Sequence, residues 1–256
     1  MLEKNAAKIL ELLTSSDLVL DIGGWACPFN RANWVMDAQP YETRGFYETV
    51  GMPAYQGGAE ERFAADTWVQ RDICDREPFP FADRQFDFVI CSHTLEDIRD
   101  PLWVCSEMVR VGQRGYIEVP SRVAESARGW EHPRIAGLSH HRWLIDIQDR
   151  SIEFLHKSHG IHSHWRFSLP RTHLRNLPED RKVQWLFWED SFEFSERLIY
   201  GLGEQQAELE EYVKSVRPYN TVRLEIDGVA RRTVNFAKRV YNGIVRRLRL
   251  SNREHS

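Results

Sequence analysis

The chain of 256 residues lacks any apolar run near the roughly 20 residues that a membrane-spanning helix needs. Its first segment, Met1–Thr14, also lacks the long apolar core and cleavage site of a secretion signal. We therefore expect a cytoplasmic protein. Cysteine is scarce and forms no CxxC pair, which disfavours a disulfide framework or a zinc site. We expect reduced, buried thiols at all four positions: Cys27, Cys74, Cys91 and Cys105.

Two cofactor-binding motifs are also absent. No GxGxxG occurs, and no GxxxxGK is followed by Ser or Thr. These glycine-rich loops cradle a pyrophosphate or a triphosphate, so their absence disfavours NAD and ATP. A nucleoside-containing cofactor without a pyrophosphate remains compatible with the sequence.

Short apolar runs alternate with helical segments through the first half of the chain. The pattern predicts helices over residues 2–13 and Pro101–Val109, the second with proline in its first turn. This alternation predicts an α/β fold, a Rossmann-like and mostly parallel sheet with helices on both faces. The predicted strands are Asp17–Ile22, Asn33–Asp37, Trp68–Ile73, Phe86–Ser92 and Gly115–Val119.

The connection between the first two strands, Gly23–Ala32, is short for a parallel crossover, so it has room for a turn or two of helix at most. Beyond Pro120 we expect a helix over residues 149–157 and strands over 163–169 and 183–188. We divide the chain into an α/β domain over residues 1–200 and a C-terminal helical extension over 201–256.

Acidic residues close three of the predicted strands. Asp21, Asp37 and Asp72 fall at the carboxyl ends, where open α/β sheets bind their ligands. A carboxylate accepts both hydroxyl hydrogens of a ribose diol, and Gly23 and Gly24 let a ligand approach the backbone. The alternative is that these acids are ordinary turn formers.

Two motifs carry a resemblance to a known family. Residues 19–24 (VLDIGG) and residues 79–101 (FPFADRQFDFVICSHTLEDIRDP) resemble the class I S-adenosylmethionine (SAM) dependent methyltransferases. The second stretch is similar, almost position by position, to the PFPDxxFDxVxxSHxLEHxxDP pattern of the small-molecule, methyltransferase type 11-like branch. The resemblance implies SAM as cofactor and methyl transfer to a small-molecule or glycan-type acceptor. It also implies that residues 121–180 of the α/β domain cover the acceptor.

The resemblance also implies roles for individual residues. Asp21, Gly23 and Gly24 would hold the methionine part of SAM, and Asp37 the ribose. The remaining cofactor contacts implied are Asp72 and Ile73 at the adenine, and Ser92 with His93 beside the sulfonium.

Histidine is concentrated in the second half of the chain. His93 and His141 are the candidate general bases, with a structural, hydrogen-bonded histidine as the alternative. His140, Arg142 and Trp143 are predicted to bind the acceptor, although Trp143 has an alternative role in packing. We expect no metal site at the HxxHxxHxH run of residues 156–164, since Gly160 interrupts it.

The first motif departs from the usual DxGxGxG pattern of the family. Trp25 and Cys27 occupy its second and third glycine positions. This departure supports an alternative function: an inactive, methyltransferase-like binding or assembly protein.

The C-terminal segment has its own charge. Val229–Ser256 carries eight Lys or Arg residues and one Glu, a net charge of +7, which leaves −11 for residues 1–228. Residues 229–250 form a basic amphipathic pattern, which favours either peripheral contact with the anionic inner face of a membrane or docking on the acidic remainder. The negative remainder argues against nucleic acid as a partner.

Overall fold

The computed structural model describes residues 1–217, so the basic helix expected over 229–250 lies outside the described residues. The chain divides into a compact unit, Met1–Val213, and a second unit that begins at Lys214. The first unit therefore extends past the domain boundary expected at residue 200. Within residues 1–217, no helix combines the length and the apolar character needed to cross a membrane.

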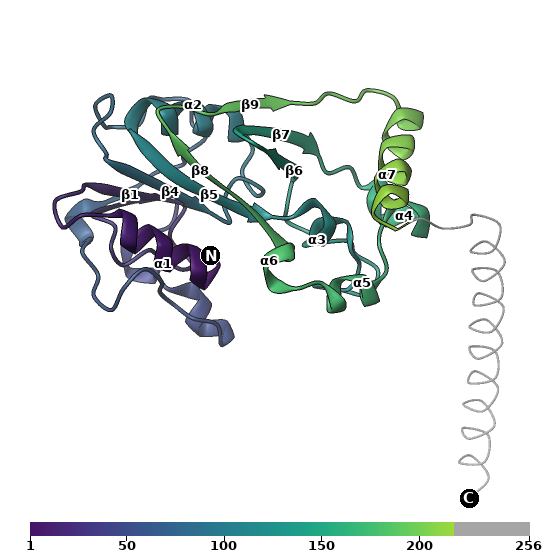
Figure 1. Cartoon of the computed structure of the whole chain (residues 1–256), viewed down its shortest axis with the longest axis horizontal. Coiled ribbons are helices and arrows are strands. Elements are labelled where there is room, and N and C mark those ends of the chain that lie inside the picture. Colours follow the sequence, from purple (N-terminus) through teal and green to yellow (C-terminus); the bar gives the residue numbers. More distant parts are fainter. Residues whose placement is uncertain (218–256) are drawn as a thin grey trace, which may run out of the picture. The chain divides into compact units, whose positions relative to one another are not determined.

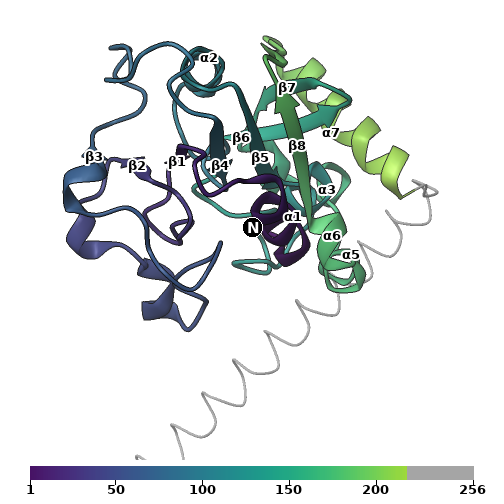
Figure 2. The ribbon, with the colours of Figure 1, turned by 60° about the vertical axis from the view of Figure 1, so that its left-hand side comes forward.

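A six-stranded sheet forms the centre of the first unit, in the order β3-β2-β1-β4-β5-β8. Neighbours among β1 to β5 run parallel, and β8 is antiparallel to β5. The predicted α/β class is confirmed, and Figure 2 shows the strands side by side. The strands are β1 (Val19–Ile22), β2 (Trp34–Asp37), β3 (Trp68–Gln70), β4 (Phe88–Ser92), β5 (Arg114–Pro120) and β8 (Val183–Glu189).

The two faces of this sheet are covered by different helices (Figure 1). α1 (Glu3–Leu12) packs through Ile9 on the face that carries Phe88 and Ile90. α2 (Pro101–Val111) packs on the opposite face, and the Asp100 carboxylate accepts the Trp103 N–H at its N-terminus (3.1 Å). Both faces of β1 and β4 are thus buried, which explains their unbroken apolar runs.

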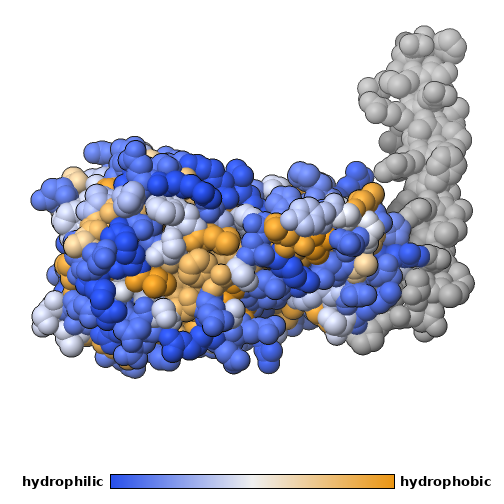
Figure 3. Space-filling model, turned by 90° about the horizontal axis from the view of Figure 1, so that it is seen from above, coloured by the Kyte–Doolittle hydropathy of each residue, from blue (hydrophilic) through white to orange (hydrophobic). Residues whose placement is uncertain are grey.

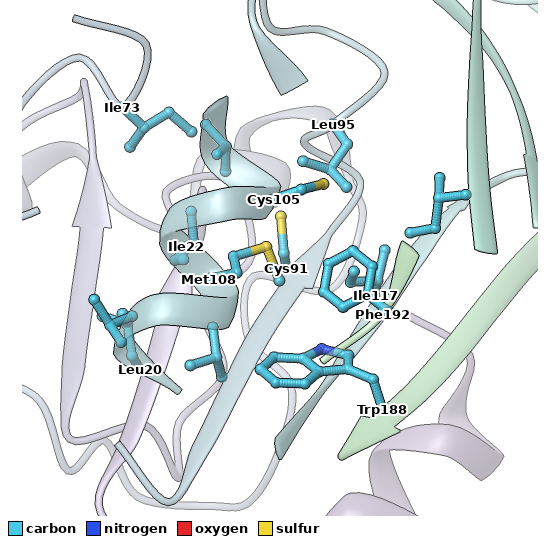
Figure 4. Close-up of a cluster of buried hydrophobic side chains, with 14 of the residues drawn as sticks. Leu20, Ile22, Ile73, Cys91, Leu95, Cys105, Met108, Ile117, Trp188 and Phe192 are labelled. Atoms are coloured by element: carbon cyan, nitrogen blue, oxygen red, sulfur yellow. The ribbon is translucent and has the colours of Figure 1, made fainter. Parts of the chain in front are cut away.

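The core on the α2 side is shown in Figure 4. Cys91 of β4 and Cys105 of α2 are fully buried there, and their side chains point toward one another beside Met108. All four cysteines are free, and Cys27 alone is only half-buried. Cys74, Cys91 and Cys105 thus act as the small core residues that we expected.

The crossovers on the β2 side of the sheet are reduced. No helix lies between Ile22 and Trp34, in agreement with the short connection noted in the sequence. Residues 38–67 contain only the 3-10 helices η1 (Tyr41–Thr43), η2 (Phe46–Val50) and η3 (Ala65–Thr67). Loops and single turns therefore connect β1 to β2 and β2 to β3, where most parallel sheets have full helices.

A second, smaller sheet has the order β6-β7-β9. Two predictions fail here: residues 149–157 form the strand β7 with its turn, and residues 163–169 form short helical turns. Asp149 (φ +51°) begins a two-residue hairpin turn, and Ile152 and Phe154 alternate into the main core. The elements are β6 (Trp143–Gln148), β7 (Ser151–His156), β9 (Glu193–Glu196), α3 (Arg122–Ser126), α4 (Gly160–Ser163), η4 (Trp165–Phe167), α5 (Arg171–Asn176), α6 (Glu179–Lys182) and α7 (Leu202–Val216).

The predicted strand over 183–188 is confirmed as β8, and α7 lies within the helical extension expected from residue 201. The face seen in Figure 3 is mostly hydrophilic, with hydrophobic residues gathered near its middle. The exposed large hydrophobic side chains include Phe46, Met52 and Trp130. These three also line the cavity described below.

Gly115 of β5 provides a test of the core. A Cβ atom there would lie 2.3 Å from the Val89 carbonyl oxygen and 2.7 Å from the Trp188 ring. We expect Gly115→Ala to lower the free energy of unfolding by about 1–3 kcal/mol, because both neighbours are packed in the sheet. Urea denaturation measures this change.

Gly203→Ala is the matched control for this variant. Gly203 is exposed in α7, and a Cβ atom added to it would have no other atom within 4 Å. Equal losses of stability in both variants would contradict this view of the core.

Candidate functional site

A cavity of about 840 Å³ opens at the carboxyl ends of the parallel strands. It lies where the strand order reverses between β1 and β4, the position at which open α/β sheets bind their ligands. Residues after β1, β2, β4 and β5 all contribute to its wall. The residues used below are Gly23, Trp25, Asp37, Phe46, Tyr47, Met52, His93, Thr94, Glu96, Asp97, Glu118, Trp130, His140 and His141.

Close packing at the strand ends requires glycine at position 23. Gly23 has a φ of +76°, and a Cβ atom there would lie 2.2 Å from the Thr94 hydroxyl oxygen. The loop after β1 and the loop after β4 therefore touch. This contact keeps the backbone of Gly23 bare at the cavity wall, where a ligand can approach it.

Asp37 ends β2 and faces the same cavity. Its carboxylate accepts the Trp25 N–H (3.1 Å) and the Gln39 N–H (2.8 Å). Burial raises the pKa of Asp37, and these backbone donors partly offset the rise. Each oxygen retains capacity to accept a further hydrogen bond from a ligand.

Aromatic side chains border Asp37. Trp25 stacks on Phe46, with ring centroids 4.9 Å apart and planes 18° from parallel. Both rings line the cavity, together with Tyr47 and Met52. This end of the cavity thus combines an apolar, flat surface with one carboxylate, which suits a nucleoside.

Asp21 stabilises the loop after β1 and does not line the cavity. Its side chain is buried, and one oxygen accepts the Phe29 N–H (2.8 Å). Burial raises its pKa to about 7, which the Phe29 hydrogen bond opposes and the Asp37 charge increases. A side chain on Gly24 would collide with this carboxylate, because its Cβ would lie 2.4 Å from Asp21 Oδ2.

His93 follows β4 and joins two acids. Its Nε2 lies 3.2 Å from Glu118 Oε1, and its Nδ1 lies 3.4 Å from Glu96 Oε1. Burial alone would lower the pKa of His93, but its contacts with Glu118 and Glu96 raise it to about 9. At neutral pH His93 therefore carries its proton and acts as a hydrogen-bond donor, which differs from the general base predicted from the sequence.

Glu118 is the fully buried partner of this pair. Burial would raise its pKa, but the hydrogen bond from His93 and the other nearby donors lower it to about 2. It also accepts hydrogen bonds from the Tyr116 hydroxyl and the Leu2 N–H (3.0 Å). Glu118 is thus an ionised carboxylate at the floor of the cavity.

A second group of polar residues lies beyond His93. Glu96 is 1% exposed, and neither of its carboxylate oxygens has a hydrogen-bond partner within the described chain. Asp97 lies beside two histidines, with its Oδ1 3.5 Å from His141 Nε2 and 3.8 Å from His140 Nε2. His141 is in turn held by Glu125, whose Oε1 lies 2.8 Å from Nδ1.

The structure brings five of the predicted site residues to the cavity and leaves seven outside its wall. Those that line it are Gly23, Asp37, His93, His140 and His141. Those outside are Asp21, Gly24, Asp72, Ile73, Ser92, Arg142 and Trp143.

The outlying residues have other contacts. Asp72 forms an ion pair with Arg99 (2.5 Å), and Ile73 is buried in the main core. Trp143 is also buried and donates its indole N–H to the Ile98 carbonyl (2.8 Å), in accordance with the packing alternative. Arg142 is exposed away from the cavity wall.

Ser92 ends β4 with a buried hydroxyl that has no hydrogen-bond partner in the described chain.

Sequence reasoning missed the acids of the cavity: Glu96, Asp97 and Glu118. One signal was available, because Glu96 and Asp97 lie within the motif of residues 79–101. The alternation of Tyr116 and Glu118 in a strand gave no sign that a carboxylate would be buried at its end.

The comparison with protein families agrees with this geometry. The family model described as "Methyltransferase domain" matches residues 49–117. This stretch contains β3, β4, α2 and the first half of β5, and the resemblance predicted from the sequence is confirmed there. The loop after β1, with Trp25 and Cys27, lies outside the match. A comparison with curated proteins gives no match.

Several solved structures are similar over part of the chain. A SAM-dependent methyltransferase from Methanosarcina mazei is 17% identical, with a TM-score of 0.33, over 55% of this chain and 85% of its own. Another from Aquifex aeolicus is 17% identical, with a TM-score of 0.29, over 46% of this chain and 65% of its own.

A cyclase is also similar, at 13% identity and a TM-score of 0.31, over 47% of this chain and 45% of its own. Three further structures are matched over 51–53% of their own length, so the chain spans about half of them. Such low identities and scores carry no information about the reaction.

The His93–Glu118 pair predicts a pH-dependent stability. The folded-state pKa of about 9 exceeds the ordinary 6.5, so the stabilisation is complete below pH 6.5 and is lost as the pH rises through 9. We expect His93→Asn to cost about 3 kcal/mol of unfolding free energy at pH 6, with a smaller deficit above pH 9. Asparagine tolerates the positive φ of this position (+55°).

Urea denaturation at pH 6, 7.5 and 9.5 measures this dependence. His159→Asn is the control, since His159 is exposed and outside the cavity wall. A deficit of His93→Asn that stays constant across this pH range would show that the histidine charge does not stabilise the fold.

Proposed function

We propose that the protein is a SAM-dependent methyltransferase that acts on a small-molecule or glycan-type acceptor. The observation that carries the proposal is the carboxylate of Asp37, which faces a cavity beside the bare backbone of Gly23 at the β1/β4 switch point. The family match over residues 49–117 supports the same reaction class.

The residues present fit the parts of SAM. Asp37 suits the ribose diol, and the stacked rings of Trp25 and Phe46 offer an apolar surface to the adenine. The cavity volume of about 840 Å³ lies within the range of ligand pockets, which is about 300–1,000 Å³. The acid Glu96 complements the positive charge of the sulfonium group.

The adenine contact differs from the one that the family resemblance implies. Asp72 is engaged by Arg99 and Ile73 is buried, so we assign the adenine to Trp25 and Phe46 instead. Trp25 stands where the family pattern has glycine. In this proposal the Trp25 ring therefore supplies the adenine contact and does not block the cofactor.

When bound, SAM would supply an electrophilic methyl group for transfer to the acceptor atom, with S-adenosylhomocysteine as the leaving group. The chain's own task is to hold the acceptor in line and to receive its proton. Glu96 is suited to this role, because the residue lies in the cavity wall and its carboxylate, apart from the ion pair with His93, has no hydrogen-bond partner in residues 1–217. His93, protonated by its two acidic neighbours, orients Glu96.

The acceptor end of the cavity is lined by Trp130, His140 and His141 together with Asp97. An aromatic face beside carboxylates and imidazoles suits a hydroxyl-bearing ring such as a sugar. Three expectations from the sequence accompany this proposal: the domain limits, the cytoplasmic location and the membrane contact of residues 229–250.

Calorimetric titration of SAM and S-adenosylhomocysteine tests the cofactor. We expect micromolar binding to the wild type and an affinity about 10–100-fold lower for Asp37→Asn, because that change removes the charge that holds the ribose diol. Asp66→Asn is the matched control: Asp66 is an exposed acid in η3, away from the cavity wall. Thermal unfolding of both variants shows whether the fold is retained.

Failure of the wild type to bind either compound would contradict the proposal. Transfer of label from methyl-labelled SAM to a panel of sugars and small hydroxylated or amine acceptors tests the reaction itself. Tight SAM binding without transfer to any acceptor would favour the alternative, a binding or assembly protein on this fold.

A further inference from the structure

We propose that Asp97, His140 and His141 bind a divalent transition-metal ion such as Zn²⁺ at the acceptor end of the cavity. One carboxylate oxygen and one imidazole nitrogen from each histidine lie within 4.8 Å of one another. Two histidines and a carboxylate are a common ligand set for such ions. These residues are distinct from the HxxHxxHxH run, whose histidines form no such group within the described residues.

The spacing is close to that of a metal centre. Bonds of about 2.0–2.2 Å in a tetrahedral site separate the ligand atoms by about 3.4 Å. Asp97 Oδ1 lies 3.5 Å from His141 Nε2 and 3.8 Å from His140 Nε2. Binding therefore needs shifts of only tenths of an ångström at these two contacts, and His140, whose side chain is 61% exposed, has room to turn.

The contacts of His141 determine which of its two nitrogens can bind a metal ion. Its Nδ1 lies 2.8 Å from Glu125 Oε1, which leaves Nε2, 3.5 Å from Asp97 Oδ1, as the nitrogen that would bind the ion once its proton is displaced. Lys157 holds the other oxygen of Glu125 (2.6 Å) and also donates to the Leu138 carbonyl (2.7 Å). Metal-binding histidines characteristically donate their second N–H to a carboxylate in this way.

The buried carboxylate oxygen of Asp97 is a second observation that favours a bound cation. Its Oδ1 is buried and has no hydrogen-bond partner in the described chain, although it lies between two imidazoles. A buried carboxylate oxygen is costly unless a cation or a proton donor compensates it. A metal ion at this point satisfies Asp97 and both Nε2 atoms at once.

The site has an open side, because all three residues line the cavity. Three protein ligands with one open position are typical of catalytic rather than structural zinc. If the proposed methyl transfer is correct, the ion would polarise an acceptor hydroxyl and lower its pKa. Metal binding itself does not depend on that function.

Titration of the untagged, metal-free full chain with ZnCl₂ by calorimetry tests the site, with the visible absorption of bound Co²⁺ as a second measurement. We expect one ion per chain and an intense tetrahedral Co²⁺ spectrum. His140→Ala and Asp97→Asn should each lower the affinity at least about tenfold and weaken the spectrum. His159→Ala is the matched control and should bind as the wild type does.

Absence of saturable Zn²⁺ and Co²⁺ binding to the wild type would overturn the proposal, and so would equal binding by His140→Ala and the wild type. His140 is exposed, so its loss leaves the core intact, and thermal unfolding verifies this. SAM titration of the same samples separates the two proposals: metal binding without SAM binding supports the metal site and contradicts the cofactor assignment.

Discussion

A fully buried carboxylate must be surrounded by hydrogen-bond donors, and the donors to Glu118 come from several parts of the chain. The Leu2 N–H and Asn5 bring the start of α1 to the end of β5, and Tyr116 donates from the same strand. His93 brings the loop after β4. Breaking such a buried pair on one side costs about 3–5 kcal/mol, so this one anion fixes both the helix and the loop that border the cavity.

The loop after β4, which begins at His93, connects Glu118 to the other acidic residues of the cavity. His93 joins Glu118 to Glu96, and the neighbouring Asp97 meets His140 and His141 of the segment after β5. The Arg142 and Trp143 N–H groups donate to the Glu96 carbonyl (2.7 and 3.3 Å), which ties that segment to the same loop through the backbone. The floor of the cavity, the wall formed by His140 and His141, and the beginning of the second sheet therefore depend on the few residues that follow β4.

The sequence predicted the parts of the fold that local pattern determines. Apolar runs buried on both faces marked β1 and β4, and Pro101 marked the start of α2. The helix predicted over residues 149–157 was wrong because a short alternation beside charged residues suits a helix as well as a hairpin, and the turn at Asp149 decided between them. Gly23, Asp37 and His93 were predictable as strand ends. The choice of Arg99 as partner for Asp72, and the meeting of His93 with Glu118, depend on tertiary packing between distant segments.

We propose the cavity beside Asp37 as the cofactor site of a methyltransferase fold. The decisive experiment is a crystal structure of the chain with S-adenosylhomocysteine. We expect the ribose hydroxyls within hydrogen-bond distance of the Asp37 carboxylate, the adenine against Trp25 and the sulfur directed toward Glu96. A ligand bound outside this cavity, or a ribose held by Asp72 in place of Asp37, would contradict it.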